Sequence, residues 1–256
     1  MKYSIEYAAL CHKGNVRSKN QDNLWCADTF LKSENDGLSE MLTGSIDASS
    51  FPAFAVFDGM GGEQQGEMAA YIAASHFHTL YHSKNVSDAK LFLLDACSEI
   101  NRRICDYQQK THVRQMGTTA ALLMCGRNDV LICNIGDSRI YQYSGKKITQ
   151  ISRDHSETSV TDRKPPLTQN LGIPETEFVI EPYIAKGHYA KGDRYLICSD
   201  GLTDMVTDTE ILTVLITRKD IVDATKELID KALEKGGIDN ITIILCEVKK
   251  QSKFHR

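Results

Sequence analysis

The sequence predicts an α+β protein in which antiparallel strands form much of the fold. Two helix-like segments, at 63–81 and 87–110, form a consecutive pair, and in the second of them apolar residues recur every three or four positions. Three strand-like segments separated by short turns follow, which is the pattern of an antiparallel meander. A second pair of helices, at 208–217 and 220–235, precedes a last strand. This order differs from the alternation of a doubly wound sheet, so we predict a mixed fold.

The other predicted elements fill the chain in order. Residues 3–11 form a first strand, and the short apolar run 54–57 suits a fully buried strand. Ser87 or Asp88 would cap the second helix. The later strands are predicted at 118–125, 130–135, 139–143, 178–185, 195–198 and 241–248.

Length and composition indicate one globular unit. The 256 residues contain no repeat and no low-complexity linker, so we expect a single domain over 1–248 and a solvated basic tail over 249–256. A net charge of −4 argues against general nucleic-acid affinity. No apolar stretch reaches the roughly 20 residues of a membrane span, and no signal-peptide core is present. Without a heptad pattern or an apolar surface stripe, we expect a monomer.

Cysteine usage points to a reducing compartment. The chain has eight cysteines but no CxxC pair, and several lie in apolar runs. Such residues are typical of buried free thiols. We therefore expect a cytoplasmic protein with reduced cysteines rather than a protein with a disulfide framework.

Aspartates carry the strongest chemical signal. Asp58, Asp137, Asp200 and Asp239 each occupy a short Gly- or Asn-bearing turn beside an apolar run. A single Asp-Gly pair is usually a plain turn, so the argument depends on their number and setting. Carboxylates at strand ends can converge, and Asp204 adds another four residues after Asp200. Clustered carboxylates repel one another unless a cation joins them, and Mg²⁺ or Mn²⁺ prefers such oxygen ligands.

Six ordered motifs resemble those of the metal-dependent protein phosphatases of the 2C type, in their bacterial form. The resemblance extends from about Tyr3 to Val248. It implies a central β-sandwich of two antiparallel sheets flanked by pairs of helices, and hydrolysis of phosphoserine and phosphothreonine in proteins. The motifs are Arg17-x-x-Asn-Gln-Asp22, Asp58-Gly-Met-Gly-Gly62, Gly117-Thr-Thr119, Gly136-Asp-Ser138, Ser199-Asp-Gly201 and Asp239-Asn240.

The same resemblance implies ligands for two Mn²⁺ or Mg²⁺ ions and a possible third. Asp58 would bridge two ions, and the Gly59 carbonyl would bind the second of them. Asp200 and Asp239 would complete the first site. The positions that match a third site are Asp137, Asp200 and Asp204.

The implied chemistry suits these residue types. Two divalent ions about 3.5–4 Å apart lower the pKa of a bridging water, so hydroxide can attack phosphorus without a protein nucleophile. Arg17 matches the residue that clamps the substrate phosphate, and its planar fork can hold two phosphate oxygens. Asp22 is expected to contact metal-bound water.

Three departures from the family pattern stand out. Met60 occupies the place of a histidine proposed as general acid in many eukaryotic relatives, so a metal-bound water or another residue must protonate the leaving group. Gln21 replaces an acidic residue. After Asp154-His155-Ser156 the closing segment 167–172 arrives almost at once, which predicts a much shortened flap. The site would then be more open, or a partner would supply selectivity. For His155 itself we favour a structural role over that of a base.

Other interpretations are weaker. A phosphoprotein-binding regulator without catalysis would be expected to lose metal carboxylates, and Asp58, Asp200 and Asp239 are intact. A phosphatase with an aspartyl nucleophile would need a DxDx[TV] segment, which is absent. His78 and His82 could form a metal pair on one helical face, but an ordinary solvated face is favoured. By resemblance alone, the partners would be phosphorylated proteins, including a serine/threonine kinase and its targets.

Overall fold

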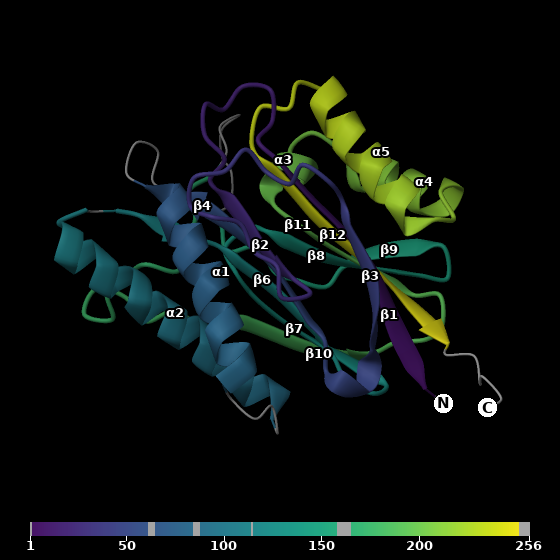
Figure 1. The fold of residues 1–256 in the computed structure, drawn as a ribbon, viewed down its shortest axis with the longest axis horizontal. Helices are drawn as coiled ribbons and strands as arrows, with labels where there is room; N and C mark the ends of the chain where they lie inside the picture. Colours follow the sequence, from purple (N-terminus) through teal and green to yellow (C-terminus); the bar gives the residue numbers. More distant parts are fainter. Residues whose placement is uncertain (1, 61–64, 84–87, 114, 158–164, 251–256) are drawn as a thin grey trace.

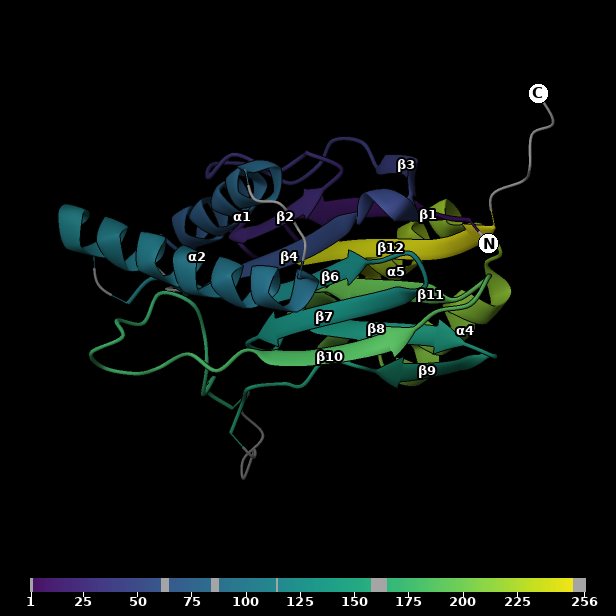
Figure 2. The same cartoon turned by 90° about the horizontal axis from the view of Figure 1, so that it is seen from below.

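The computed structural model describes residues 2–60, 65–83, 88–113, 115–157 and 165–250. Within these residues two antiparallel sheets pack face to face (Figures 1 and 2). The first sheet has the order β3 (Leu42–Asp47), β1 (Tyr3–His12), β12 (Ile241–Lys250), β11 (Arg194–Cys198), β8 (Arg139–Ser144) and β9 (Lys147–Gln150). The second has the order β10 (Tyr183–His188), β7 (Asp129–Ile135), β6 (Ala120–Cys125), β4 (Ala53–Met60) and β2 (Asp22–Cys26), and the short β5 (Gly117–Thr118) pairs with β4.

Helices cover both outer faces of the sandwich. In Figure 1 one pair lies at the lower left and the other at the upper right, with the sheets between them. The first pair is α1 (Gly66–Ser83) and α2 (Ala89–Thr111), and the second is α4 (Asp208–Thr217) and α5 (Ile221–Glu234). The short α3 (Asp200–Thr203) follows β11, and a 3-10 turn, η1 (Ala48–Ser50), precedes β4.

Three buried clusters correspond to the three interfaces between these four layers. One joins α1 and α2 to the second sheet, and another joins α4 and α5 to the first. The third fills the space between the sheets. Along β12, Ile244 faces the second sheet while Leu245 faces the helices, because successive side chains of a strand point to opposite faces. The predicted β-sandwich flanked by helix pairs is confirmed.

The predicted helices agree closely with the observed ones. The helix predicted at 208–217 has those bounds, and Asp220 caps α5 by accepting hydrogen bonds from the next helical amides. Asp88 caps α2 in the same way, and Ser87 lies outside the described residues. In the described part of the chain, α1 begins at Gly66.

The strand predicted at 178–185 was placed wrongly. Residues 175–177 form a turn, the Phe178 amide after it donates to the Pro174 carbonyl, and β10 begins only at Tyr183. Pro182 has no amide hydrogen for a sheet, which fits a strand that starts just after it. The strands β2, β3 and β9 were not predicted.

The basic tail also begins later than expected. β12 continues to Lys250, and the Lys249 ammonium contacts the carboxylates of Glu247 at 2.6 Å and Glu6 at 3.4 Å. Residues 249 and 250 therefore belong to the first sheet, and 251–256 lie outside the described residues. All eight cysteines are buried and free. No helix in the described part of the chain is both long and apolar enough to cross a bilayer.

Candidate active site

The predicted site residues meet at one end of the sandwich. Asp58 lies near the end of β4, Asp137 lies in the turn from β7 to β8, and Asp200 begins α3 just after β11. Asp239 immediately precedes Asn240 and β12. One cavity of about 340 Å³ is lined by Arg17, Gln21, Asp58, Gly59, Met60, Thr119, Asp137, Pro165, Leu167, Asp200 and Asp239.

Two of the predicted residues are not among those that line this cavity. Asp22 is 2% exposed and lies directly opposite Asp58 in the register of β2 and β4, so it forms part of the floor. Asp204 is exposed at the C-terminal end of α3, where its amide donates to the Asp200 carbonyl at 2.8 Å. The structure thus brings the other six together at the cavity, with Asp22 in the floor and Asp204 outside the lining.

Hydrogen bonds from a threonine pair hold the backbone at Asp58. The Asp58 carbonyl accepts from the Thr119 amide and from the Thr118 hydroxyl, each at 2.9 Å. The Asp58 amide donates to the Thr119 hydroxyl at 3.1 Å, and that hydroxyl also lies 2.7 Å from the Ser138 hydroxyl. Because Ser138 follows Asp137, Thr119 connects the end of β4, which carries Asp58, to the turn that carries Asp137.

Gly59 is required by close packing of backbone segments. A Cβ atom there would lie 2.1 Å from the Gly66 carbonyl oxygen and 2.5 Å from that of Gln21. The Gly59 amide donates to the same Gln21 carbonyl at 3.1 Å. The start of α1 therefore packs directly against this strand end. Gly61 and Gly62, which complete the predicted motif, lie outside the described residues.

Asp22 is a buried carboxyl group held by neutral donors. Its Oδ2 accepts from the Thr242 hydroxyl at 2.6 Å and from the Ser199 hydroxyl at 2.7 Å. Burial raises the pKa of Asp22 to about 6, the two hydroxyl groups oppose that shift, and the nearby charge of Asp239 adds to it. A carboxyl group in this position favours a nearby cation.

Arg17 and Asp239 form a bidentate ion pair at the rim of the site. The Arg17 Nε and Nη2 atoms donate to the two Asp239 oxygens at 2.9 and 2.6 Å. The Arg17 side chain is 51% exposed, and its hydrogen bonds to Asp239 raise the pKa of the guanidinium. The arginine predicted to clamp a phosphate thus holds a predicted metal ligand in this structure.

Asn240 organises the approach to Asp239 but was not predicted as a site residue. Its Nδ2 donates to the carbonyls of Lys13 at 2.7 Å and Lys19 at 2.9 Å, and its Oδ1 accepts from the Gln21 amide at 2.8 Å. The side chain is buried and clamps the loop between β1 and β2, which includes Arg17. The only signal in the sequence is its place after Asp239.

His155 positions the turn at Asp137. Its amide donates to the Gly136 carbonyl at 3.0 Å, and its Nδ1 accepts from the Gly136 amide at 3.2 Å. Gly136 has a φ of +94°, in the region that favours glycine, and a Cβ there would collide with Thr119. Burial lowers the pKa of His155. This arrangement agrees with the structural role that was favoured.

Glu67 is an acidic residue beside the site that sequence reasoning did not find. Its carboxylate accepts from the Lys19 ammonium at 2.6 Å and from Gln21 Nε2 at 3.1 Å. Burial raises the pKa of Glu67, but these two hydrogen bonds, a backbone hydrogen bond and the charge of Lys19 together lower it further, so the net shift is downward. The neutral Gln21 therefore has a carboxylate partner 46 positions away, and no local pattern reveals that contact.

The segment predicted as a shortened flap is closed at its base. Ser156 pairs with Leu167, and the Thr168 amide donates to the His155 carbonyl at 2.8 Å. Pro165 and Leu167 line the cavity. Residues 158–164 lie outside the described residues, so the shortening stays a prediction.

The donor set fits hard divalent cations. Four carboxylates line the cavity, a fifth is buried next to it, and Gly59 leaves room for backbone to approach. Ligands built from oxygen suit Mg²⁺ and Mn²⁺. A four-layer sandwich with such a cavity at its end defines a carboxylate-based metal centre suited to hydrolysis.

Comparison with known proteins identifies the family. Residues 18–235 match the family model described as protein phosphatase 2C, and the chain belongs to this family. It is 28% identical over 254 residues to the serine/threonine phosphatase stp of Listeria welshimeri, with 92% of each protein covered.

Solved structures show the same fold. The catalytic domain of the serine/threonine protein phosphatase PstP, in complex with two manganese ions, is 27% identical with a TM-score of 0.79. That match covers 97% of this chain and all of the other. PppA of Pseudomonas aeruginosa is 26% identical, also with a TM-score of 0.79, over 96% of this chain and 99% of the other.

Proposed function

We propose that the chain is a metal-dependent protein phosphatase that hydrolyses phosphoserine and phosphothreonine in proteins. The observation that carries this proposal is the convergence of Asp58, Asp137, Asp200 and Asp239 with Arg17 on one cavity. Similarity to serine/threonine phosphatases along nearly the whole chain supports it.

The carboxylates would hold two Mn²⁺ or Mg²⁺ ions. Asp58 would bridge them, the Gly59 carbonyl would bind one, and Asp200 and Asp239 would bind the other. When bound, the two ions would lower the pKa of a water between them and offset the negative charge of the phosphate. The two manganese ions of the PstP structure support this number. A third ion would take Asp137, Asp200 and Asp204.

The Arg17–Asp239 pair implies an exchange of partners during substrate binding. Both oxygens of Asp239 are engaged by Arg17, so the guanidinium must turn away before its fork can hold a phosphate. A cation at Asp239 would replace the charge that Arg17 removes. The exposure of Arg17 leaves the side chain room to move. Arg17 would then bind and orient the phosphate through two parallel hydrogen bonds.

The floor of the site keeps Asp22 in a fixed orientation. Ser199 and Thr242 donate to one of its oxygens, and the register with β4 places it beside Asp58. Asp22 would order water next to the reacting phosphate, because the two hydroxyl groups fix the orientation of its carboxyl group.

The leaving group must receive a proton from a source other than histidine. Met60 lines the cavity and cannot donate one, and the described residues that line the cavity include no histidine. His155 is engaged with Gly136. The cavity carboxylates are the proposed metal ligands and would be ionised, so water would supply the proton.

We further propose that the substrates are phosphorylated proteins, including a serine/threonine kinase and its targets, and that the protein acts as a cytoplasmic monomer. The buried, free cysteines support a reducing compartment.

The test is phosphate release from a phosphothreonine peptide with and without Mn²⁺. We expect turnover by the wild type only with the ion, and loss of turnover in Asp239→Asn. Asp129→Asn is the matched control, because Asp129 pairs with Lys186 at the opposite end of β7 from Asp137. A folded wild type that binds Mn²⁺ without turnover would contradict the proposal and favour a phosphoprotein-binding regulator, with Gln21 the first position to restore to an acid.

A further inference from the structure

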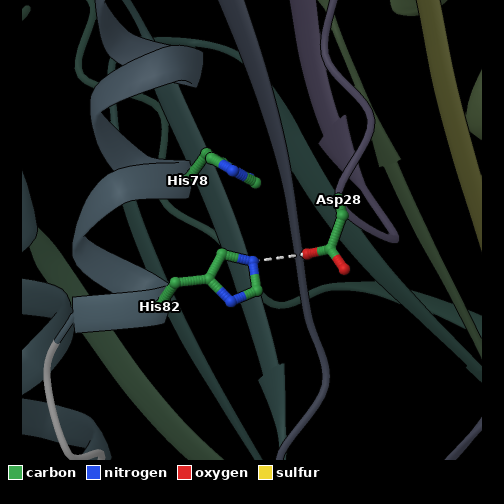
Figure 3. Close-up of side chains that lie close together, drawn as sticks. All are labelled: Asp28, His78 and His82. Atoms are coloured by element: carbon green, nitrogen blue, oxygen red, sulfur yellow. Dashed lines mark hydrogen bonds and ion pairs between the residues drawn. The ribbon is translucent and has the colours of Figure 1, made fainter.

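A second group of metal-binding side chains lies away from the cavity. His78 and His82 project from α1 toward Asp28, which lies in the turn after β2 (Figure 3). One potential ligand atom from each of the three residues lies within 4.8 Å of the others. The solvated face expected from the sequence describes His82, whose side chain is 49% exposed, but His78 is half-buried.

The backbone holds the three side chains in this arrangement. The two histidines are one helical turn apart on the same face of α1. Asp28 is the second residue of a two-residue turn closed by hydrogen bonds of 3.0 Å in both directions between Cys26 and Thr29. That turn presents the carboxylate to the helix, and His82 Nε2 lies 2.7 Å from Asp28 Oδ1. The rings of His78 and His82 meet edge to face, with centroids 4.7 Å apart.

The spacing requires only small side-chain movements to surround an ion. Tetrahedral ligands at the usual Zn²⁺ distances of about 2.0–2.1 Å lie about 3.3 Å from one another. To reach this spacing, His82 Nε2 and Asp28 Oδ1 would move apart from 2.7 Å. The two ligand atoms that are farthest apart, which lie within 4.8 Å of each other, would move closer together. The exposure of Asp28 and His82 leaves the remaining position open to water.

The ligand types select a different metal from that of the cavity. Imidazole nitrogen suits zinc, nickel and copper, whereas Mg²⁺ and Mn²⁺ favour the all-oxygen set of the active site. We propose that Asp28, His78 and His82 form a second metal site, which takes Zn²⁺ or a similar transition-metal dication and clamps α1 to the β2 turn. The same two elements carry Glu67 and Asp22 toward the active site, so the clamp joins them at their opposite ends.

A hydrogen bond to Trp25 makes this site observable. Trp25 Nε1 donates to His78 Nδ1 at 3.2 Å, and Trp25 is the single tryptophan of the chain. Binding of an ion at Nδ1 replaces the indole donor. Binding at Nε2 requires the ring proton to move to Nδ1, which then no longer accepts. Either mode ends the Trp25 hydrogen bond and changes the surroundings of its ring.

The experiment is a titration of the full chain with NiCl₂ while Trp25 fluorescence is followed, in the presence of saturating MgCl₂ to occupy the carboxylate centre. Nickel serves as the probe because it quenches nearby tryptophan. We expect saturable quenching that ZnCl₂ reverses by competition. His82→Gln and Asp28→Asn each remove a ligand. Loss of a residue that only supports a metal ligand already lowers metal affinity by about tenfold or more, so the nickel affinity of each variant should fall by at least about tenfold.

Two comparisons decide the outcome. His188→Gln, which alters an exposed histidine on β10, should leave the titration unchanged. Both site residues are largely exposed, so the variants should fold, and an unchanged fluorescence spectrum without metal would verify it. The proposal is overturned if quenching is absent, or if His82→Gln and Asp28→Asn titrate like the wild type. In that case His82 and Asp28 form an ordinary surface ion pair.

Discussion

The floor and the rim of the active site stabilise their carboxylates in opposite ways. At the floor, Asp22 is buried and accepts hydrogen bonds from the neutral hydroxyl groups of Ser199 and Thr242. At the rim, Asp239 is one-third exposed and pairs with the charged fork of Arg17. The floor residues belong to strands or adjoin them, whereas the rim pair joins two loops. The floor can therefore hold a fixed position, while the rim can exchange a cation and a phosphate.

The largest effect is expected where floor and rim meet. Asp58 faces Asp22 across the register and lines the cavity with Asp239. Asp58→Asn removes the charge proposed to bridge two ions. Even residues that merely support a metal ligand account for up to about a hundredfold in affinity or activity, so Mn²⁺-dependent phosphopeptide hydrolysis should fall by at least that factor. Retention of more than a tenth of the wild-type rate would remove Asp58 from its proposed role.

The second effect tests the role of Arg17 at the rim. Arg17→Lys keeps the charge but loses the planar fork, so we expect weaker phosphate binding by about 1.5–3 kcal/mol, or roughly ten- to hundredfold in KM for a phosphopeptide. The affinity for Mn²⁺ should stay the same or rise, because Asp239 loses a bidentate competitor. Steady-state kinetics and metal titration on the same variant separate the two quantities. An unchanged KM would mean that Arg17 serves only as a partner of Asp239.

The third effect tests the hydrogen bond from Thr242 to Asp22 in the floor. Thr242→Val removes a hydroxyl group that donates to the buried Asp22 carboxyl, and should destabilise the fold by about 1–3 kcal/mol. Thr225→Val is a matched control, because Thr225 in α5 is equally buried and its hydroxyl has no hydrogen-bond partner among the described residues. The control should be neutral or stabilising. Equal losses in urea denaturation would show that the hydrogen bond to Asp22 is unimportant.

The smallest effect concerns how the stability of the fold depends on pH through the charge of Asp22. Because burial raises the pKa of Asp22 to about 6 in the folded state, the folded state binds the proton more tightly than the unfolded state. Stability without metal should therefore decrease as pH rises from about 4 through 6. Asp22→Asn removes this dependence and should stabilise the protein in EDTA at pH 8 by about 1–3 kcal/mol, with little difference near pH 4. A variant that is less stable than wild type at pH 8 would contradict the raised pKa.

The parts of the fold that local signals define were predictable. The helices α4 and α5 have side-chain caps at Thr207 and Asp220 and amphipathic faces, and both were predicted to within about a residue. The strand β2 was missed because its first two residues are polar. Asn23 is nonetheless buried, and its side chain bonds to both the amide and the carbonyl of Leu31. Hydrogen bonds between a side chain and the backbone of a residue eight positions away leave no periodic pattern in the sequence.

The same distinction applies to the site. The carboxylates that line the cavity were predictable because each lies next to an apolar run in a short sequence that contains glycine or asparagine. The structure places Asp58 in β4 and Asp200 in α3 rather than in turns. Glu67, Asn240 and Thr242 were not, because their contacts join positions 46 to 227 residues apart. The ion pair between Arg17 and Asp239 likewise depends on how two loops meet, 222 positions apart in the chain.

The most direct test of the metal centre is the number of Mn²⁺ ions bound at equilibrium, followed by electron paramagnetic resonance of the free ion. The wild type should bind at least two ions per chain, and Asp58→Asn should lose at least one of them. Arg17→Lys should retain them all while its KM rises. Equal binding by wild type and Asp58→Asn would contradict a metal centre built on these carboxylates.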